Sequence, residues 1–289
     1  MIVVFGSINV DLIVPVAHLP APGETVLGDD YTMAPGGKGA NQALAARRAG
    51  ADVTMIGAVG RDGFAEAALS LLRRDRVDLD LVATSLRPTG CATITVDPKG
   101  ENQIAVSSGA NLDVVAAQMP DRLLGPGTVL VLQREIPIAE NAALICRARE
   151  RGARIVMSVA PAGPIAPAQS EDIDIIIANE GEASAGGLGS QPRPRQALIV
   201  THGALGVVAY LSKGGEIVAP ALPIEPVDTT GAGDTFAGVL AAGLDEGLPF
   251  DLALRRASAA AALACLAIGA QSAMPDRAAI DAAVARLPG

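Results

Sequence analysis

Aromatic side chains are almost missing from this sequence. The 289 residues include four Phe, two Tyr and no Trp, which is 2% of the chain. Proteins that bind nucleic acids without sequence preference stack the bases on such flat side chains and usually present a basic surface. This chain instead has a formal net charge of −9. The composition therefore argues against a nucleic-acid partner.

Histidine and cysteine are also scarce. The chain has two His and three Cys, and the three cysteines, Cys91, Cys146 and Cys265, lie far apart in the sequence. They show no spacing typical of a metal site or of a disulfide framework. A zinc site is therefore nearly excluded, and we expect a reduced, cytoplasmic enzyme.

Long hydrophobic runs are absent as well. Residues 1–14 are apolar but lack a basic leading segment, and Asp11 interrupts them, so a buried strand is a better interpretation than a secretory signal. The longest apolar stretch, residues 257–270, is shorter than the roughly 20 residues that span a bilayer. We therefore expect no membrane partner.

The sequence does contain enough apolar residues for a substantial core, since 50% are hydrophobic and 18% are charged. Apolar, β-branched runs alternate with helical patterns, which predicts βαβ units and a doubly wound, mostly parallel sheet. The predicted strands of this sheet are residues 2–5, 53–58, 128–132, 154–158, 173–178 and 197–201. A hairpin is predicted at 207–211 and 216–219. The predicted helices are residues 41–49, 64–74, 138–151, 235–245, 251–267 and 278–287.

Two segments do not fit this alternation. Residues 11–34 are rich in Pro and Gly, and residues 89–106 read as a hairpin around Asp97-Pro-Lys-Gly100. They are either two halves of a small β lid or a pair of ordinary surface hairpins. The predicted division is an α/β domain of residues 1–10, 36–88 and 107–289, with a lid of residues 11–35 and 89–106. Residues 186–196 are predicted to form a loop.

The first glycine-rich turn is Ala34-Pro-Gly-Gly-Lys-Gly-Ala-Asn41, ahead of a predicted helix. It is not a P-loop, because Thr32 stands where that motif needs Gly and Gly39 stands where it needs Ser or Thr. It is either a tight turn or a site for an anion or hydroxyl at a helix N-terminus. Lys38, one of only three lysines, favours the site.

The second glycine-rich turn is Asp228-Thr-Thr-Gly-Ala-Gly-Asp-Thr-Phe236, again ahead of a helix. Asp234 could be a simple N-cap. However, Gly231-Ala-Gly233 leaves the backbone amides open to a bulky anion. A carboxylate beside that anion makes sense if it handles a hydroxyl proton. The turn is not a dinucleotide-binding fingerprint, which disfavours an NAD-dependent oxidoreductase.

Further polar residues follow several predicted strands. Asn9 and Asp11 are two apart at the end of the first strand, so both can face one ligand or simply form a turn. Glu135, Asn179-Glu-Gly-Glu182 and Thr201-His-Gly-Ala-Leu-Gly206 follow later strands. Each alone is an ordinary loop. Together they converge on the carboxyl edge of the predicted sheet, where α/β proteins bind ligands.

These motifs resemble those of the PfkB family of carbohydrate kinases, over nearly the whole chain. The resemblance rests on Gly6-Ser-Ile-Asn-Val-Asp11, Pro22-Gly-Glu-Thr25, Gly36-Gly-Lys-Gly-Ala-Asn41 and the Asp228–Phe236 motif. It implies a doubly wound α/β domain with a small β lid. It also implies ATP-dependent phosphorylation of a small sugar, D-ribose to D-ribose 5-phosphate, and a homodimer formed through the lids.

The resemblance assigns roles to individual residues. Asp234 would be the catalytic base, beside an anion hole made by the amides of Gly231, Ala232 and Gly233. The residues expected to bind the sugar are Asn9, Asp11, Gly36, Gly37, Lys38, Asn41, Glu135 and Asp234 itself. The other residues expected on the ATP side are Asn179, Glu182, Thr201, Gly203 and Gly206.

Two metal ions are implied. Mg²⁺ would accompany ATP, arranged through water by Asn179 and Glu182. K⁺ would act as an activator, held by the Asp228 carboxylate and by carbonyls of Thr230, Ala264, Ala267 and Gly269. The chain departs from the family pattern at Ser158-Val-Ala-Pro161, at Ala273 and in the short 186–196 loop. Ala273 stands where a serine often completes the K⁺ site.

Two alternatives remain open at this point. One is a kinase of the same family acting on deoxyribose, fructose or 2-keto-3-deoxygluconate. The other is a regulator that binds a sugar or a nucleotide without catalysis, which the intact Asp234 motif disfavours.

Overall fold

Nine strands form one large sheet in the computed structural model, which describes residues 1–189 and 194–287. Across the sheet the order is β13-β12-β11-β10-β9-β8-β1-β4-β5. All neighbouring pairs from β11 to β5 are parallel, and β12 and β13 extend the sheet antiparallel. The strands are β1 (Ile2–Phe5), β4 (Val53–Val59), β5 (Asp78–Thr84), β8 (Val129–Leu132), β9 (Arg154–Ser158), β10 (Ile175–Asn179), β11 (Ala197–Thr201), β12 (Val207–Leu211) and β13 (Glu216–Ala219).

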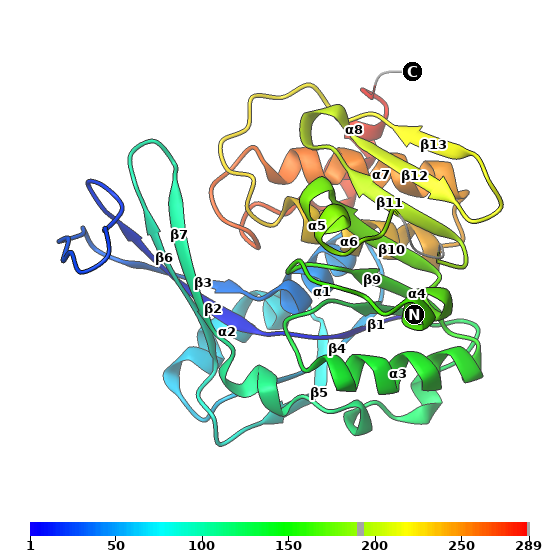
Figure 1. Cartoon of the computed structure of the whole chain (residues 1–289), viewed down its shortest axis with the longest axis horizontal. Coiled ribbons are helices and arrows are strands. Elements are labelled where there is room, and N and C mark those ends of the chain that lie inside the picture. Colours follow the sequence, from blue (N-terminus) through cyan, green and yellow to red (C-terminus); the bar gives the residue numbers. More distant parts are fainter. Residues whose placement is uncertain (190–193, 288–289) are drawn as a thin grey trace.

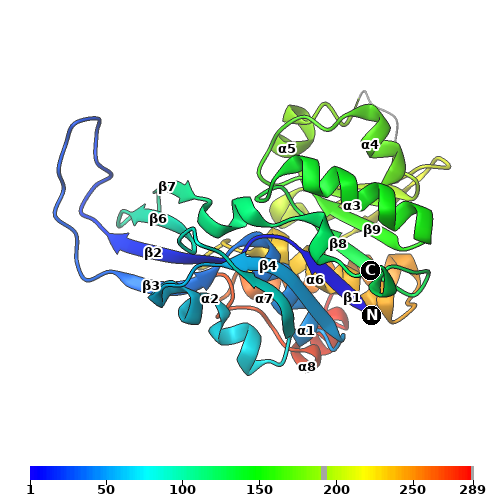
Figure 2. The same cartoon turned by 90° about the horizontal axis from the view of Figure 1, so that it is seen from below.

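Helices cover both faces of this sheet (Figure 2). One face carries α1 (Lys38–Arg48), α2 (Gly63–Arg74), α6 (Ala232–Asp245), α7 (Phe250–Ala264) and α8 (Arg277–Val284); the other carries α3 (Ile138–Arg151), α4 (Pro167–Asp172) and α5 (Glu180–Ala185). Short 3₁₀ helices span Gly109–Asp113, Ala116–Gln118, Asp121–Leu123 and Gly203–Leu205. The predicted doubly wound α/β fold is therefore confirmed.

The central strands are buried on both faces, which explains their unbroken apolar sequences. In β1, Ile2 and Val4 belong to the core layer under α1 and α6, while Val3 and Phe5 belong to the layer under α3. All four side chains are fully buried. Because successive strand residues alternate faces, one four-residue apolar run supplies both layers.

Several predicted elements differ from the structure. β5 was not predicted, because it is an edge strand whose Asp78 and Asp80 interrupt the apolar pattern. The predicted helix 251–267 is too long, since α7 ends at Ala264. The Cys265 carbonyl accepts hydrogen bonds from the Val227 and Asp228 amides instead, at 2.8 and 3.3 Å. The short helices α4 and α5 were also not predicted.

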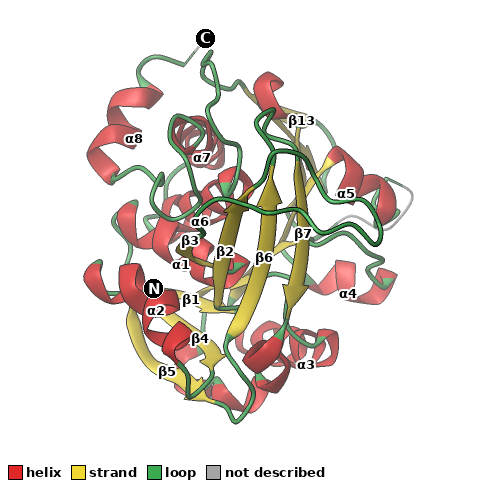
Figure 3. Cartoon of the chain, turned by 90° about the vertical axis from the view of Figure 1, so that its left-hand side faces the viewer, coloured by secondary structure: helices red, strands yellow, loops and turns green. Residues whose placement is uncertain are grey.

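A second, four-stranded sheet stands out from the large one (Figures 1 and 3). Its order is β3-β2-β6-β7, with β2 and β6 parallel and the two outer pairs antiparallel. The strands are β2 (Asn9–Pro15), β3 (Thr32–Gly36), β6 (Gly90–Val96) and β7 (Asn102–Ser107). Asn9 and Asp11 therefore both lie on β2 of this small sheet. Asn9 is not at the end of the first strand as predicted, whereas Asp11 falls inside the segment 11–35 that was predicted as lid.

Two further sequence predictions concern loops and membranes. In the predicted 186–196 loop, Gly186 ends α5, and residues 190–193 lie outside the described residues. No helix in the described part of the chain has the length and apolar character needed to span a membrane.

Candidate active site

Asp234 is the third residue of α6, close to the helix N-terminus. The N-cap is Gly231, in the left-handed conformation with φ of 75°, and no side chain caps the helix. The alternative that Asp234 is merely an N-cap is therefore wrong. Its carboxylate is free for another role, although only 7% of the residue is exposed.

Two amide side chains from α1 hold the Asp234 carboxylate. Asn41 Nδ2 donates to one carboxylate oxygen at 3.0 Å, and Gln42 Nε2 donates to the other at 2.9 Å. This contact requires α1 and α6 to pack closely, and Gly238 permits it. A Cβ at Gly238 would lie 2.4 Å from the Gln42 carbonyl oxygen. Among the described residues, these two hydrogen bonds fix the orientation of the Asp234 carboxylate, and no ion pair contributes.

Lys38 lies within electrostatic reach of several carboxylates. Its pKa is raised above the ordinary lysine value, chiefly by Asp234 and further by Glu135, Glu182 and Asp11, while burial opposes the increase. Lys38 is therefore a charged ammonium at neutral pH. It links the predicted sugar-binding residues electrostatically to Glu182 of the predicted ATP side.

Glu135 organises the first glycine-rich turn. Its Oε2 accepts hydrogen bonds from the Ser7 hydroxyl at 2.6 Å and from the Lys38 amide at 3.0 Å, and the Ser7 hydroxyl accepts one from the Gly39 amide at 3.2 Å. Gly37 has a φ of 89°, and a Cβ there would lie 2.7 Å from the Asn9 amide nitrogen. Glycine is required at Gly37 by both conformation and space.

Asn9 is held from the far side by Asn111, which sequence analysis did not identify. Asn111 Nδ2 donates to Asn9 Oδ1 at 2.7 Å, and Asn111 Oδ1 accepts from the Ile8 amide at 2.9 Å. Both asparagines are buried. The Asn9 side chain is consequently positioned by an internal network.

Asp11 pairs in register with Ala34 of β3, and its carboxylate lies against Gly36, two residues further along that strand. A Cβ at Gly36 would lie 2.4 Å from both Asp11 carboxylate oxygens, so the glycine makes room for this carboxylate. Burial raises the pKa of Asp11 to about 6, with further increases from Glu135 and Asp234 and a partly opposing effect of Lys38. Three carboxylates thus converge around one ammonium group.

The residues predicted for ATP form a second group, along the neighbouring strand ends. Asn179 caps α5, with its Oδ1 accepting from the Glu182 amide at 2.8 Å and Glu182 Oε2 accepting from the Asn179 amide at 2.9 Å. Asn179 pairs in register with Thr201 of β11. A Cβ at Gly206 would lie 2.2 Å from the Ala219 carbonyl oxygen, so packing alone requires glycine at this position, whether or not Gly206 contacts ATP. Gly203 is exposed beside it.

Two of the residues predicted for K⁺, Thr230 and Gly269, donate hydrogen bonds to Asp228. Its Oδ1 accepts from the Thr230 amide and hydroxyl, at 2.8 and 2.6 Å, and its Oδ2 accepts from the Gly269 amide at 2.8 Å. These bonds lower the pKa of Asp228, although burial opposes them. Carboxylate and carbonyl oxygens are hard donors, which suit an alkali cation.

No cluster of three or more His, Cys, Asp or Glu side chains that could hold a metal occurs among residues 1–189 and 194–287. The residues predicted to bind the sugar lie close together in the structure. Their hydrogen-bond partners Ser7, Gln42 and Asn111 extend this group. Ser7 lies inside a motif that sequence analysis had singled out, and Gln42 directly follows another.

A buried carboxylate with fixed orientation thus stands beside a helix N-terminus whose first turn is Ala232 and Gly233. Polar groups suited to hydroxyls surround it. Phosphoryl transfer requires such positioned groups and open amides more than it requires a strong base. The fold and the site define a phosphotransferase that acts on a small hydroxylated molecule.

The chain belongs to the pfkB family of carbohydrate kinases, whose sequence pattern matches residues 1–277. It is 37% identical to the ribokinase of Bacillus subtilis (strain 168) over 287 residues, covering 96% of each chain. The crystal structure of ribokinase from Thermotoga maritima has a TM-score of 0.90 at 28% identity, covering 99% of both chains. Arabidopsis thaliana ribokinase complexed with ribose and ATP has a TM-score of 0.85 at 28% identity, covering 98% of both chains.

Proposed function

We propose that this chain catalyses the ATP-dependent phosphorylation of D-ribose to D-ribose 5-phosphate. The observation that carries the proposal is the Asp234 carboxylate, buried and held by two amide side chains at the start of α6. Relatives of nearly the same length, at 36–37% identity, are ribokinases. A structural relative binds ribose and ATP together.

The sugar would bind between β2 of the small sheet and the N-terminal turn of α1. Asp11 and Glu135 offer carboxylate oxygens to hydroxyl donors, Lys38 offers an ammonium, and Asn9 and Asn41 offer amides. The main-chain amides of Gly36 and Gly37 complete the set. Since this set has no aromatic side chain, it would recognise the sugar by its hydroxyl pattern, and analogues lacking one hydroxyl would be rejected strongly.

Asp234 would orient and deprotonate the hydroxyl that attacks the γ-phosphate. Its two oxygens already accept from Asn41 and Gln42, and each retains a further lone pair for the sugar hydroxyl. The amides of Gly231, Ala232 and Gly233 would stabilise the charge on the transferring phosphoryl group. The opening is free of bulk, since a Cβ at Gly233 would meet nothing within 4 Å.

Asn179, Glu182 and Thr201 would line the approach of the ATP phosphates, with Gly203 and Gly206 nearby. Asn179 is exposed, Glu182 is half-buried, and both stand at the N-terminus of α5. Mg²⁺ bound with ATP supplies neutralisation of the phosphate charge. Asp228 and the carbonyls of Thr230, Ala264, Ala267 and Gly269 would hold K⁺, and Ala273 contributes no oxygen from its side chain.

The small sheet would act as a lid, and two lids would pair in a homodimer. Asp11, Ile104 and Val106 lie on one face of this sheet by register. Ile104 and Val106 are 56% and 52% exposed in the single chain. A second copy would cover them. We expect a dimer mass in solution at micromolar concentration, monomers for Ile104→Asp, and an unchanged dimer for Ala105→Asp on the opposite face.

The decisive experiment replaces Asp234 by Asn. We expect kcat to fall by about 10²–10⁴-fold, with ribose affinity kept within a few-fold because the amide retains shape and polarity. Asp251→Asn, in the first turn of α7, is the matched control and should retain full activity. Undiminished phosphorylation by the Asp234→Asn protein would refute the mechanism.

A substrate panel separates the remaining candidates. Ribose should have the highest kcat/KM among ribose, deoxyribose, fructose and 2-keto-3-deoxygluconate, each assayed with ATP and Mg²⁺. A different best substrate would overturn the sugar assignment and leave the kinase class intact. Tight ribose binding with no phosphorylation at all would favour the non-catalytic regulator.

We also propose that this protein is located in the cytoplasm.

A further inference from the structure

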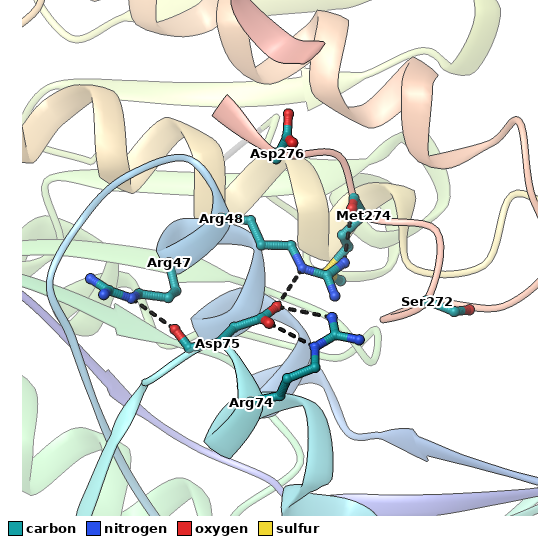
Figure 4. A pocket seen from close by; sticks show the side chains of 7 residues that line it. All are labelled: Arg47, Arg48, Arg74, Asp75, Ser272, Met274 and Asp276. Atoms are coloured by element: carbon teal, nitrogen blue, oxygen red, sulfur yellow. Dashed lines mark hydrogen bonds and ion pairs between the residues drawn. The ribbon is translucent and has the colours of Figure 1, made fainter. Parts of the chain in front are cut away.

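A polar cavity of about 570 Å³ lies at the C-terminal ends of α1 and α2 (Figure 4). None of the residues assigned above to the sugar, ATP or K⁺ lines it. α1 connects the two places, since its first residue is Lys38 and its last is Arg48. At 1.5 Å per residue they are about 15 Å apart. The lining residues are Arg47, Arg48, Arg74, Asp75, Ser272, Met274 and Asp276.

Three arginines in one cavity are unexpected in a chain of net charge −9. Asp75 is the shared anionic partner of two of them: Arg48 Nε donates to its carboxylate at 2.7 Å and Arg74 Nε at 2.8 Å. Arg47 Nε donates to the Asp75 backbone carbonyl instead, and its Nη1 pairs with Asp52 outside the cavity lining. Asp276 is engaged elsewhere, because its carboxylate caps α8 by accepting from Ala279. One carboxylate therefore serves two guanidinium groups, and the lining residues carry three positive and two negative formal charges.

Unused donors remain on these arginines. Within the described part of the chain, Arg48 Nη2 and Arg74 Nη1 have no assigned partner, and the Arg74 side chain is 60% exposed. Guanidinium groups match the geometry of phosphate oxygens and bind them with paired hydrogen bonds. The volume is in the range of small-molecule sites. We propose that this cavity, which we term the arginine pocket, binds a small phosphate ester at the Arg48 and Arg74 guanidinium groups.

The arginine pocket is connected to the phosphoryl-transfer site by one loop. Arg48 Nη1 donates to the carbonyls of Gln271 and Met274, at 2.7 and 2.8 Å. Just before them in the chain, Gly269 donates to Asp228. Ala270 packs so tightly on Gly231 that a Cβ there would lie 2.8 Å from the Ala270 Cβ. The loop thus has the arginine pocket on one side and the anion hole on the other.

Occupation of the pocket has a definite electrostatic consequence. A phosphate ester bound to Arg48 and Arg74 would give both guanidinium groups a second anionic partner, and would fix Arg48 between the ester and Asp75. Arg48 would then hold the carbonyls of Gln271 and Met274 more firmly. Because this loop supports the anion hole through Gly231, the apparent KM for ATP should decrease about two- to fivefold when the pocket is filled.

Binding is tested by calorimetric titration with glycerol 3-phosphate, using protein saturated with ribose and a non-hydrolysable ATP analogue. Wild-type protein should bind one equivalent. Arg74→Gln should weaken binding at least tenfold, and the neighbouring Arg73→Gln, which lies outside the cavity and pairs with Glu66, should not. The titration is repeated without sugar and nucleotide. The comparison of the three proteins then remains valid even if ribose is not the substrate.

The possible outcomes discriminate clearly. Binding that Arg74→Gln abolishes and Arg73→Gln preserves supports the pocket. No binding, or equal binding by all three proteins, overturns it. Tighter binding of succinate than of glycerol 3-phosphate would overturn the phosphate assignment. An ATP KM that does not decrease with glycerol 3-phosphate in the wild type, or decreases equally in Arg74→Gln, would overturn the connection through the loop.

Discussion

Replacement of Asp11 by Asn should stabilise the ligand-free protein and weaken its binding of ribose. Asp11 is a carboxyl that burial, Glu135 and Asp234 all disfavour in its charged form, so its pKa is raised from 3.8 to about 6. At about 1.36 kcal/mol per pH unit, that difference corresponds to about 3 kcal/mol against the folded state once the group is ionised. Asn has the same shape without the charge.

The pH dependence of this effect has a definite sign. Between pH 3.8 and about 6 the unfolded chain has released the Asp11 proton while the folded protein keeps it. Raising the pH through this window therefore favours unfolding. For the wild type roughly half of the 3 kcal/mol is lost by pH 5 and nearly all by pH 7.5. The stability gain of Asp11→Asn should accordingly increase by about 1.5 kcal/mol between these two values.

The assay is urea unfolding of both proteins at pH 5, 6 and 7.5 without ligands, analysed by linear extrapolation. Asp113→Asn is the matched control with the opposite sign. Ser85 and Arg87 lower the pKa of Asp113 by hydrogen bonding, so its replacement should destabilise slightly at pH 7.5. An Asp11→Asn protein that is less stable than wild type at pH 7.5, or a difference independent of pH, would refute the reasoning.

The same substitution should impair sugar binding. A hydrogen bond to a charged group contributes about 1.5–3 kcal/mol, so the KM for ribose should increase about 10- to 100-fold. In the wild type, kcat/KM for ribose should fall as the pH drops below about 6, where Asp11 takes up a proton. The Asp11→Asn profile should lack this inflection. Stability and activity are thus expected to change in opposite directions at one residue.

Three further predictions concern other parts of the structure. Gly231→Ala should lose about 1–2 kcal/mol of stability, because Gly231 has a left-handed φ and packs on Ala270. Gly233→Ala should not lose stability, because the space around Gly233 is open. Equal urea midpoints for the two variants would contradict this. Asp228→Asn should abolish any activation of kcat by K⁺ over Na⁺, and an unchanged activation ratio would place the cation elsewhere. Arg134→Met should raise the melting temperature, since Arg134 Nη1 is buried with no partner among the described residues; a lower value would show that the guanidinium has an unrecognised role.

The sequence was sufficient for features that depend on local pattern. The apolar runs of β1, β9 and β11 gave the correct bounds, because parallel central strands need no polar face. The glycine-rich turns correctly placed Lys38 and Asp234 where a helix begins, since α1 starts at Lys38 and Asp234 lies in the first turn of α6.

Features that depend on tertiary contacts were not predictable. Asn111 is separated from Asn9 by 102 positions, and nothing in its neighbourhood marks it as a partner. The early end of α7 is set by hydrogen bonds from Val227 and Asp228 to Cys265, although the alanine-rich sequence favours a longer helix. The assignment of Asn9 to the small sheet also required the cross-strand pairing with Gly36 and Gly90.

The electrostatics of the site explain why these residues are assembled at a cost in stability. Asp11, Glu135 and Asp234 carry three negative charges around the single ammonium of Lys38, so the ligand-free site is electrostatically unbalanced. Sugar hydroxyls can relieve this, because each can donate a further hydrogen bond to one of these carboxylates. A ligand with fewer hydroxyls leaves a buried charge unpaired, which costs more than the lost contact itself. The instability of the empty site and its discrimination between polyols therefore have the same physical origin.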